Sequence, residues 1–177
     1  MRKDLGVKPY IYPQPVLVLG TYDKGGRENA MTAAWGGMYD DDLVYVCLGE
    51  HKSTENIRES RALTISIADK KTVKQADYVG TISFYEEKNK LTHCGLTPIK
   101  SSKVNAPYFE EFLLTLECEL VKETESGIIA KIINVMVDDK ILNKDGKIDM
   151  KKFAPIAFDS DNREYYEITN KVGKSML

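Results

Sequence analysis

The sequence predicts a mainly β protein, folded as a barrel or a sandwich, with only a few short helices. Three observations predict this class. Runs rich in β-branched and aromatic residues are short and numerous, turn signals separate them at close spacing, and the helical segments are short. The sequence also lacks the regular strand–helix alternation that is typical of a doubly wound parallel sheet.

The first half of the chain is expected to contain an arm, four strands and a helix. Three prolines among the first fifteen residues indicate an extended N-terminal arm. Strands are expected at residues 16–22, 28–35, 43–49 and 62–68. Asp23-Lys24-Gly25-Gly26 forms the turn between the first two strands, and a helix is expected over 51–61.

The second half begins with a short helix at 72–80, followed by a loop excursion over 83–106 without firm periodicity. Strands 112–124 and 128–142 form the clearest hairpin of the chain, turning at Ser126-Gly127. A further turn follows at 143–146. The remaining tail contains one expected aromatic strand at Tyr165-Tyr166.

Composition and charge restrict the class of function. The 177 residues, 42% of them hydrophobic, suit a single domain that buries its own core. The net charge of -2 gives no general attraction to nucleic acid or to an anionic membrane. The sequence has no apolar run of membrane-spanning length and no signal peptide pattern. Three widely spaced cysteines favour a reducing compartment, so we expect a cytoplasmic protein.

The segment 29–37 is the first candidate binding site. It places small residues around two polar ones and ends near the only tryptophan; its candidate residues are Asn29, Ala30, Met31, Thr32, Ala33 and Trp35. Small side chains let another molecule approach the backbone of a strand, and Trp35 offers a stacking face. A tightly packed central strand with a core tryptophan explains the same composition.

The segment 52–56 is the second candidate. Lys52 precedes the hydroxyls of Ser53 and Thr54 at the expected start of a helix. Free backbone N–H groups, the positive helix end and a lysine together can bind a phosphate. An ordinary helix cap with an exposed lysine is the alternative, and the negative charge of Glu55 favours it. A mononucleotide cofactor needs both features: a strand whose backbone its ring can approach closely, and a helix start that binds its phosphate.

Six short patterns occur in order along the chain. They are Pro13-x-Pro15-Val16, Asn29-x-Met31-Thr32-x-x-Trp35, Lys52-x-Thr54-x-x-Ile57, Ala76-Asp77-Tyr78-Val79-Gly80, Gly95-Leu96-Thr97 and Leu116-Glu117-Cys118. Their order and spacing resemble the FMN-binding split-barrel family, most of all its flavoredoxin and flavin reductase-like branch. The resemblance implies one Greek-key split β-barrel domain with a core over about residues 9–170.

The resemblance also implies roles for individual residues. Asn29 and Thr32 would contact the isoalloxazine ring or the ribityl chain of FMN, and Trp35 would lie near the flavin. The phosphate would be held by Lys52, Ser53 and Thr54. Lys90 matches a family lysine close to the flavin, and Phe158 would cover the cofactor. Proteins of this kind form homodimers, which implies a homodimer here.

The resemblance points to electron transfer through bound FMN, with no side chain required as a catalytic acid or base. Members that use NADH often carry a histidine at the late hairpin, where this chain has Ser126-Gly127-Ile128. The sequence therefore favours a flavoredoxin type whose partner is NAD(P)H or a redox protein. An NAD(P)H-dependent flavin reductase and a non-enzymatic ligand-binding barrel remain alternatives. No metal site is expected, because the two histidines and three cysteines do not gather at ligand spacing.

Overall fold

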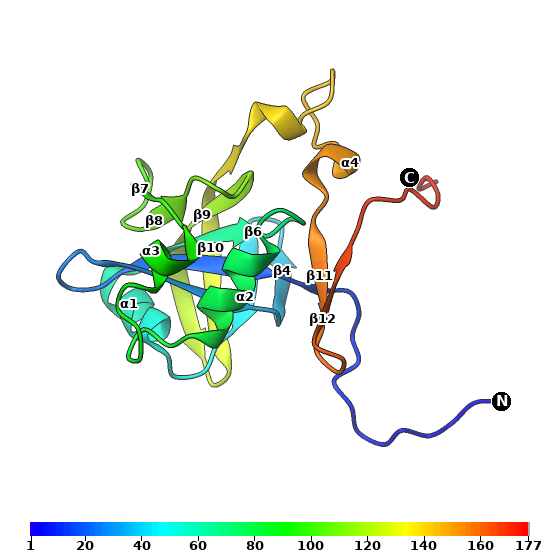
Figure 1. Ribbon diagram of the computed structural model, residues 1–177, viewed down its shortest axis with the longest axis horizontal. Helices are drawn as coiled ribbons and strands as arrows, with labels where there is room; N and C mark the ends of the chain where they lie inside the picture. The colour runs from blue at the N-terminus through cyan, green and yellow to red at the C-terminus, as the bar shows by residue number, and fades with distance from the viewer. Residues whose placement is uncertain (177) are drawn as a thin grey trace.

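A seven-stranded antiparallel sheet forms the body of the computed structural model, which describes residues 1–176 (Figure 1). Its order is β3-β2-β6-β9-β10-β5-β4. These strands are β2 (Leu17–Tyr22), β3 (Glu28–Ala33), β4 (Gly36–Asp40), β5 (Leu43–Cys47), β6 (Ala62–Ile67), β9 (Leu114–Thr124) and β10 (Gly127–Val137). The sheet curls into an open barrel, so the prediction of a mainly β barrel with few helices is confirmed.

Short helices and small sheets surround this body. The helices are α1 (Lys52–Ser60), α2 (Val73–Thr81), α3 (Lys90–Cys94), the 3-10 helix η1 (Asp139–Ile141) and α4 (Met150–Phe153). The remaining strands are β1 (Gln14–Pro15), β7 (Pro98–Lys100), β8 (Pro107–Phe109), β11 (Ile156–Asp159) and β12 (Glu164–Glu167). No helix within residues 1–176 is both long and apolar enough to span a membrane.

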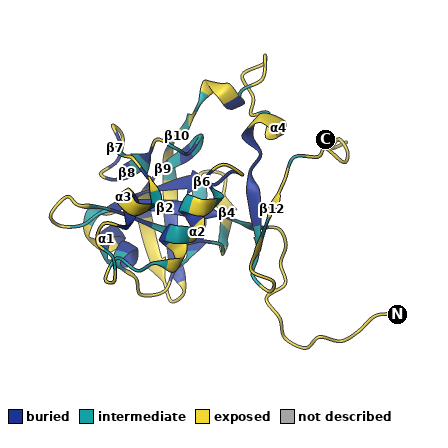
Figure 2. Ribbon diagram, in the orientation of Figure 1, coloured by how far each residue is buried: buried dark blue, intermediate teal, exposed yellow. Residues whose placement is uncertain are grey.

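Two hydrophobic clusters lie on opposite faces of β2 and its neighbours. Leu19 and Ile65 belong to the cluster inside the curled sheet, which Ile57 of α1 also joins. Val18 faces the other cluster, which α2 covers with Ala76 among other residues. Both faces of the central strands are therefore buried, as Figure 2 shows, and the strand backbones are held rigidly where α1 and α2 meet them.

The hairpin β11–β12 stands beside the barrel and pairs with β1 (Figure 1). A backbone hydrogen bond connects it to the body: Ile156 N donates at 3.1 Å to the carbonyl oxygen of Ala68, the residue after β6. The same pairing places Gln14 opposite Phe158. Residues 1–13 form the predicted extended arm, without a helix or strand.

Several predicted strand ends were wrong. The strand expected over 28–35 ends at Ala33, because the chain turns at residues 34–35 into β4. The sequence did not reveal β4, since its two glycines and its terminal aspartate have low strand propensity. The strand expected over 128–142 ends at Val137. Asp138 then caps η1 by accepting a hydrogen bond from Lys140 N, which stops the strand. The strand β11 was missed in the tail.

The excursion over 83–106 is also more ordered than the sequence predicted. It contains α3, which begins after Asn89 and ends at Gly95 in the left-handed conformation. The hairpin β7–β8 follows and seats Phe109 in the second hydrophobic cluster. A five-residue helix and three-residue strands are too short to show a hydrophobic period, so the sequence did not reveal them.

Candidate flavin site

The start of α1 faces a cavity and carries no side-chain cap. His51 occupies the N-cap position, but its side chain accepts no hydrogen bond from the first turn. Thr54 turns away and donates to Gly49 O at 2.7 Å. Lys52 and Ser53 both line the cavity. The first turn therefore presents a lysine, a hydroxyl and backbone N–H groups that no side chain caps, a combination suited to an anion.

Asn29 of β3 connects the strand to this helix start. Its side-chain Nδ2 donates to Ser53 Oγ at 2.8 Å, and the residue is only 2% exposed. Its Oδ1 is buried and has no hydrogen-bond partner among residues 1–176. A buried amide oxygen without a donor is costly, so this atom points to a ligand that supplies a hydroxyl or N–H group.

Helix α2 packs very closely on β3. Thr32 Oγ1 donates to Ala76 O at 2.6 Å. A Cβ atom added to Gly80 would lie 2.9 Å from Thr32 Cβ, so a larger residue at position 80 would push the helix away. Two small residues one helical turn apart thus bring the α2 backbone to the wall of the cavity.

Lys90 places a buried positive charge at the same cavity. The residue is 3% exposed, and its Nζ donates to Ile82 O at 3.0 Å and to Val79 O at 3.4 Å. Within the described residues, no carboxylate forms an ion pair with it. Burial lowers the pKa of Lys90 to about 8. The ammonium lacks a counter-ion, so an anionic ligand would stabilise it.

Two adjoining cavities result from this arrangement. The first has a volume of about 300 Å³, at the lower end of the range for small-molecule sites. The second, of about 180 Å³, shares Thr32, Gly80 and Thr81 with the first and continues to Phe158 and Tyr165. These two rings pack with centroids 5.1 Å apart. The pair of cavities runs from a polar end, lined by Lys52, Lys90 and Glu50, to an end lined by the aromatic rings of Phe158 and Tyr165.

The structure brings together most of the residues that the sequence suggested. The first cavity is lined by Asn29, Met31, Thr32, Lys52, Ser53 and Lys90, and the second by Thr32 and Phe158. Three other candidates are buried outside the cavities. Ala30 packs under α2, Ala33 faces the barrel core, and Thr54 bonds to the preceding loop.

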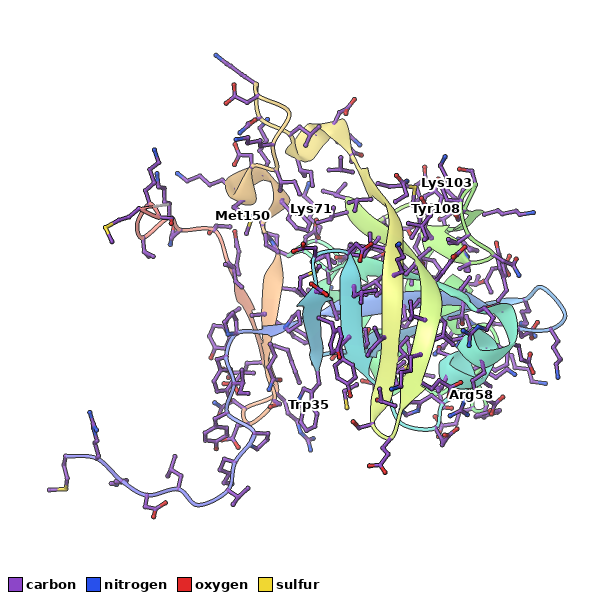
Figure 3. All side chains as sticks on the ribbon, turned by 180° about the vertical axis from the view of Figure 1, so that it is seen from behind. Trp35, Arg58, Lys71, Lys103, Tyr108 and Met150 are labelled. Carbon is purple, nitrogen blue, oxygen red and sulfur yellow. The ribbon has the colours of Figure 1, made fainter. Side chains whose placement is uncertain are left out.

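Trp35 does not join these residues. It is 53% exposed and lies in a different, largely apolar cavity of about 610 Å³, which the N-terminal arm borders through Pro9 and Ile11. In Figure 3, Trp35 lies near β4 and the arm, well away from Arg58 of α1. The cause is local, because residue 35 falls in the link between β3 and β4 rather than on β3 itself.

The sequence did not identify the segment that borders the polar end. Phe84 and Tyr85 line the first cavity from the stretch that was expected to be a plain loop. The only available signal was a pair of adjacent aromatic residues in a polar stretch, which does not by itself reveal a neighbour.

Residues 10–160 match the family model described as the flavin reductase like domain. The chain therefore belongs to the flavin reductase-like family, a class of flavoproteins built on a split barrel. The predicted resemblance and fold class are confirmed. A curated relative, described as an uncharacterized protein of Archaeoglobus fulgidus, is 31% identical over 149 residues, covering 80% of this chain and 81% of the relative.

Solved structures agree with this assignment. The flavoredoxin of Desulfovibrio vulgaris (Miyazaki F) is 36% identical and superimposes with a TM-score of 0.95, covering 99% of this chain and 98% of that one. A flavoredoxin from Methanosarcina acetivorans is 23% identical and superimposes with a TM-score of 0.87. The match covers 99% of this chain and 96% of the Methanosarcina chain. The second match concerns the fold alone.

Proposed function

We propose that this protein retains FMN and transfers electrons through it, as a flavoprotein of flavoredoxin type. The observation that carries the proposal is the composition of the two adjoining cavities. An uncapped helix start, an unpartnered buried amide oxygen and a buried lysine line one end, and aromatic rings line the other. FMN has the matching order of phosphate, hydroxylated chain and planar ring.

The polar end fits the phosphate. A terminal phosphate carries about -1.5 to -2 charges at neutral pH and accepts several hydrogen bonds. Lys52 and Ser53 would hold it together with the first N–H groups of α1. Asn29 Oδ1 would accept a hydrogen bond from a ribityl hydroxyl, which removes the only unsatisfied atom of that side chain.

The remaining residues would position the ring and exclude water from it. Close packing of Gly80 on Thr32 leaves the backbone of α2 at the cavity wall, and Phe158 closes the second cavity. Lys90 supplies a fixed positive charge that favours a more negative ligand. When bound, FMN supplies reversible electron uptake, while the protein supplies binding, orientation and electrostatics.

A binding titration tests the phosphate assignment. We expect Lys52→Ala to weaken FMN binding by about tenfold or more, because a charge-assisted contact is lost. Riboflavin, which lacks the phosphate, should bind both proteins equally. Lys24→Ala is the matched control, since Lys24 also pairs with a glutamate of α1 but lies 82% exposed, outside the cavity. An equal loss of affinity for FMN and riboflavin in Lys52→Ala would contradict the placement of the phosphate at Lys52.

A turnover assay separates the proposed role from that of a flavin reductase. If FMN is a retained cofactor, the purified protein should keep its FMN through gel filtration. It should also oxidise NAD(P)H only slowly when free flavin is added. Rapid NAD(P)H oxidation that depends on added free flavin would instead support a reductase that treats flavin as a substrate.

We also propose that the chain is one split-barrel domain that forms a homodimer in the cytoplasm. Support for a dimer comes from exposed apolar side chains on the outer sheet, including Met38 of β4 and Ile133 and Val135 of β10. The three cysteines are free, as expected in a reducing compartment. Sedimentation velocity tests the dimer, since a monomer at all concentrations would contradict it.

A further inference from the structure

The polar end of the first cavity is bordered by a contact between two distant segments. Tyr85, from the stretch after α2, donates from its hydroxyl to Glu55 Oε1 of α1 at 2.5 Å. Lys52 Nζ donates to the other oxygen of the same carboxylate at 3.1 Å. One carboxylate therefore joins Lys52 at the helix start to Tyr85, and both of these residues line the cavity.

The segment that carries Tyr85 is held in place independently. Arg27 Nη2, from the turn between β2 and β3, donates to Lys88 O at 2.8 Å and to Asn89 Oδ1 at 3.1 Å. The same guanidinium lies 5.4 Å from the centre of the Phe84 ring. Tyr85 thus sits on a braced segment, and its contact with Glu55 connects that segment to the first turn of α1.

The charge of this contact also matters. Hydrogen bonds from Tyr85 and Lys52 hold the pKa of Glu55 below its ordinary value, so the carboxylate stays ionised at neutral pH. A terminal phosphate can draw Lys52 toward itself while Glu55 remains at the rim. A second phosphate, continuing outward past the helix start, would meet this negative charge directly.

We propose that the contact among Tyr85, Glu55 and Lys52 makes the site selective for a flavin that ends in a monophosphate and excludes flavin dinucleotides such as FAD. This inference rests on the proposed function, because it assumes that the flavin phosphate lies at the start of α1. On this proposal the adenylyl extension of FAD would leave the cavity beside that helix start, where Tyr85 lines the cavity and its hydrogen bond to Glu55 links the two segments.

The test compares three flavins on the flavin-free protein by quenching of flavin fluorescence. We expect the unaltered protein to bind FMN at least about tenfold more tightly than FAD, since admitting FAD breaks a charge-assisted hydrogen bond. Tyr85→Ala should bring FAD to within about threefold of FMN, while riboflavin affinity stays the same. Tyr85 is exposed, so this variant is expected to fold.

A matched control uses a second exposed tyrosine–glutamate pair. Tyr166 donates to Glu164 Oε2 at 2.5 Å on β12, and neither residue lines the flavin cavities. Tyr166→Ala should leave the preference for FMN over FAD unchanged. Equal affinity for FMN and FAD in the unaltered protein, or an unchanged preference in Tyr85→Ala, would overturn the selectivity. Failure to bind FMN at all would overturn the proposed function itself.

Discussion

Replacing Lys90 by methionine should make the flavin-free protein more stable and its flavin binding weaker. The side chain is buried without a counter-ion in the described part of the chain, and a fall of its pKa from 10.5 to about 8 corresponds to about 3 kcal/mol at neutral pH. Methionine has a similar length and needs no hydration. Its cost is the loss of the donor to two carbonyls, those of Val79 and Ile82, at about 1 kcal/mol each. The expected net gain in the free energy of unfolding is therefore about 1 kcal/mol.

The gain depends on pH with a definite sign. Below pH 8 the folded and the unfolded chain both carry the proton on Lys90, so the folded state bears the full cost of burying the charge. Between pH 8 and 10.5 only the unfolded chain keeps the proton, and the stability of the unaltered protein rises with pH. The advantage of Lys90→Met should therefore shrink as the pH rises above 8.

Urea unfolding of the flavin-free proteins at pH 7 and pH 9.5 measures both effects. Lys88→Met is the matched control, because Lys88 is exposed two residues away and its side chain lies outside the cavity. In Lys90→Met, FMN binding should weaken by about tenfold, because the bound ligand no longer lies near a buried positive charge. The reasoning is refuted if Lys90→Met is less stable at pH 7, or if its advantage does not change with pH.

Three further substitutions test the packing, two of them at the site and one at the β5–β10 pairing away from it. Gly80→Val should weaken FMN binding by about tenfold or more, because the new side chain pushes α2 away from Thr32; a titration measures it. Asn29→Leu should lower FMN affinity and leave Ser53 Oγ without its donor, and a Kd equal to that of the unaltered protein would contradict this role. Gly127→Ala should destabilise the fold by about 2 kcal/mol in thermal unfolding without a specific effect on flavin, because an added Cβ would clash with the β5 backbone.

Sequence patterns predicted those parts of the fold that repeat over many residues. The strands β9 and β10 have eleven residues each and alternate clearly, so their hairpin was found with its turn. β4 was missed because Gly36-Gly37 and a terminal aspartate give it little strand propensity; pairing with β5 supplies its stability. The helix α3 was missed because five residues are too few to show a period.

The candidate site was predictable only where local chemistry reveals it. Lys52 and Ser53 could be found because a helix start is a local pattern with a known affinity for anions. The burial of Lys90, and the contact between Tyr85 and Glu55, depend on long-range packing of α2, α3 and α1. The position of Trp35 depended on one boundary, because ending β3 two residues earlier moves that ring to another cavity.

The most direct test of FMN retention is the visible absorption spectrum of the purified protein, with the released flavin identified after heat denaturation. We expect a yellow protein that releases about one FMN per chain, with little or no FAD or riboflavin. A colourless protein that takes up no added FMN would contradict it. The cavity between α1, α2 and β3 would then have to serve a different ligand.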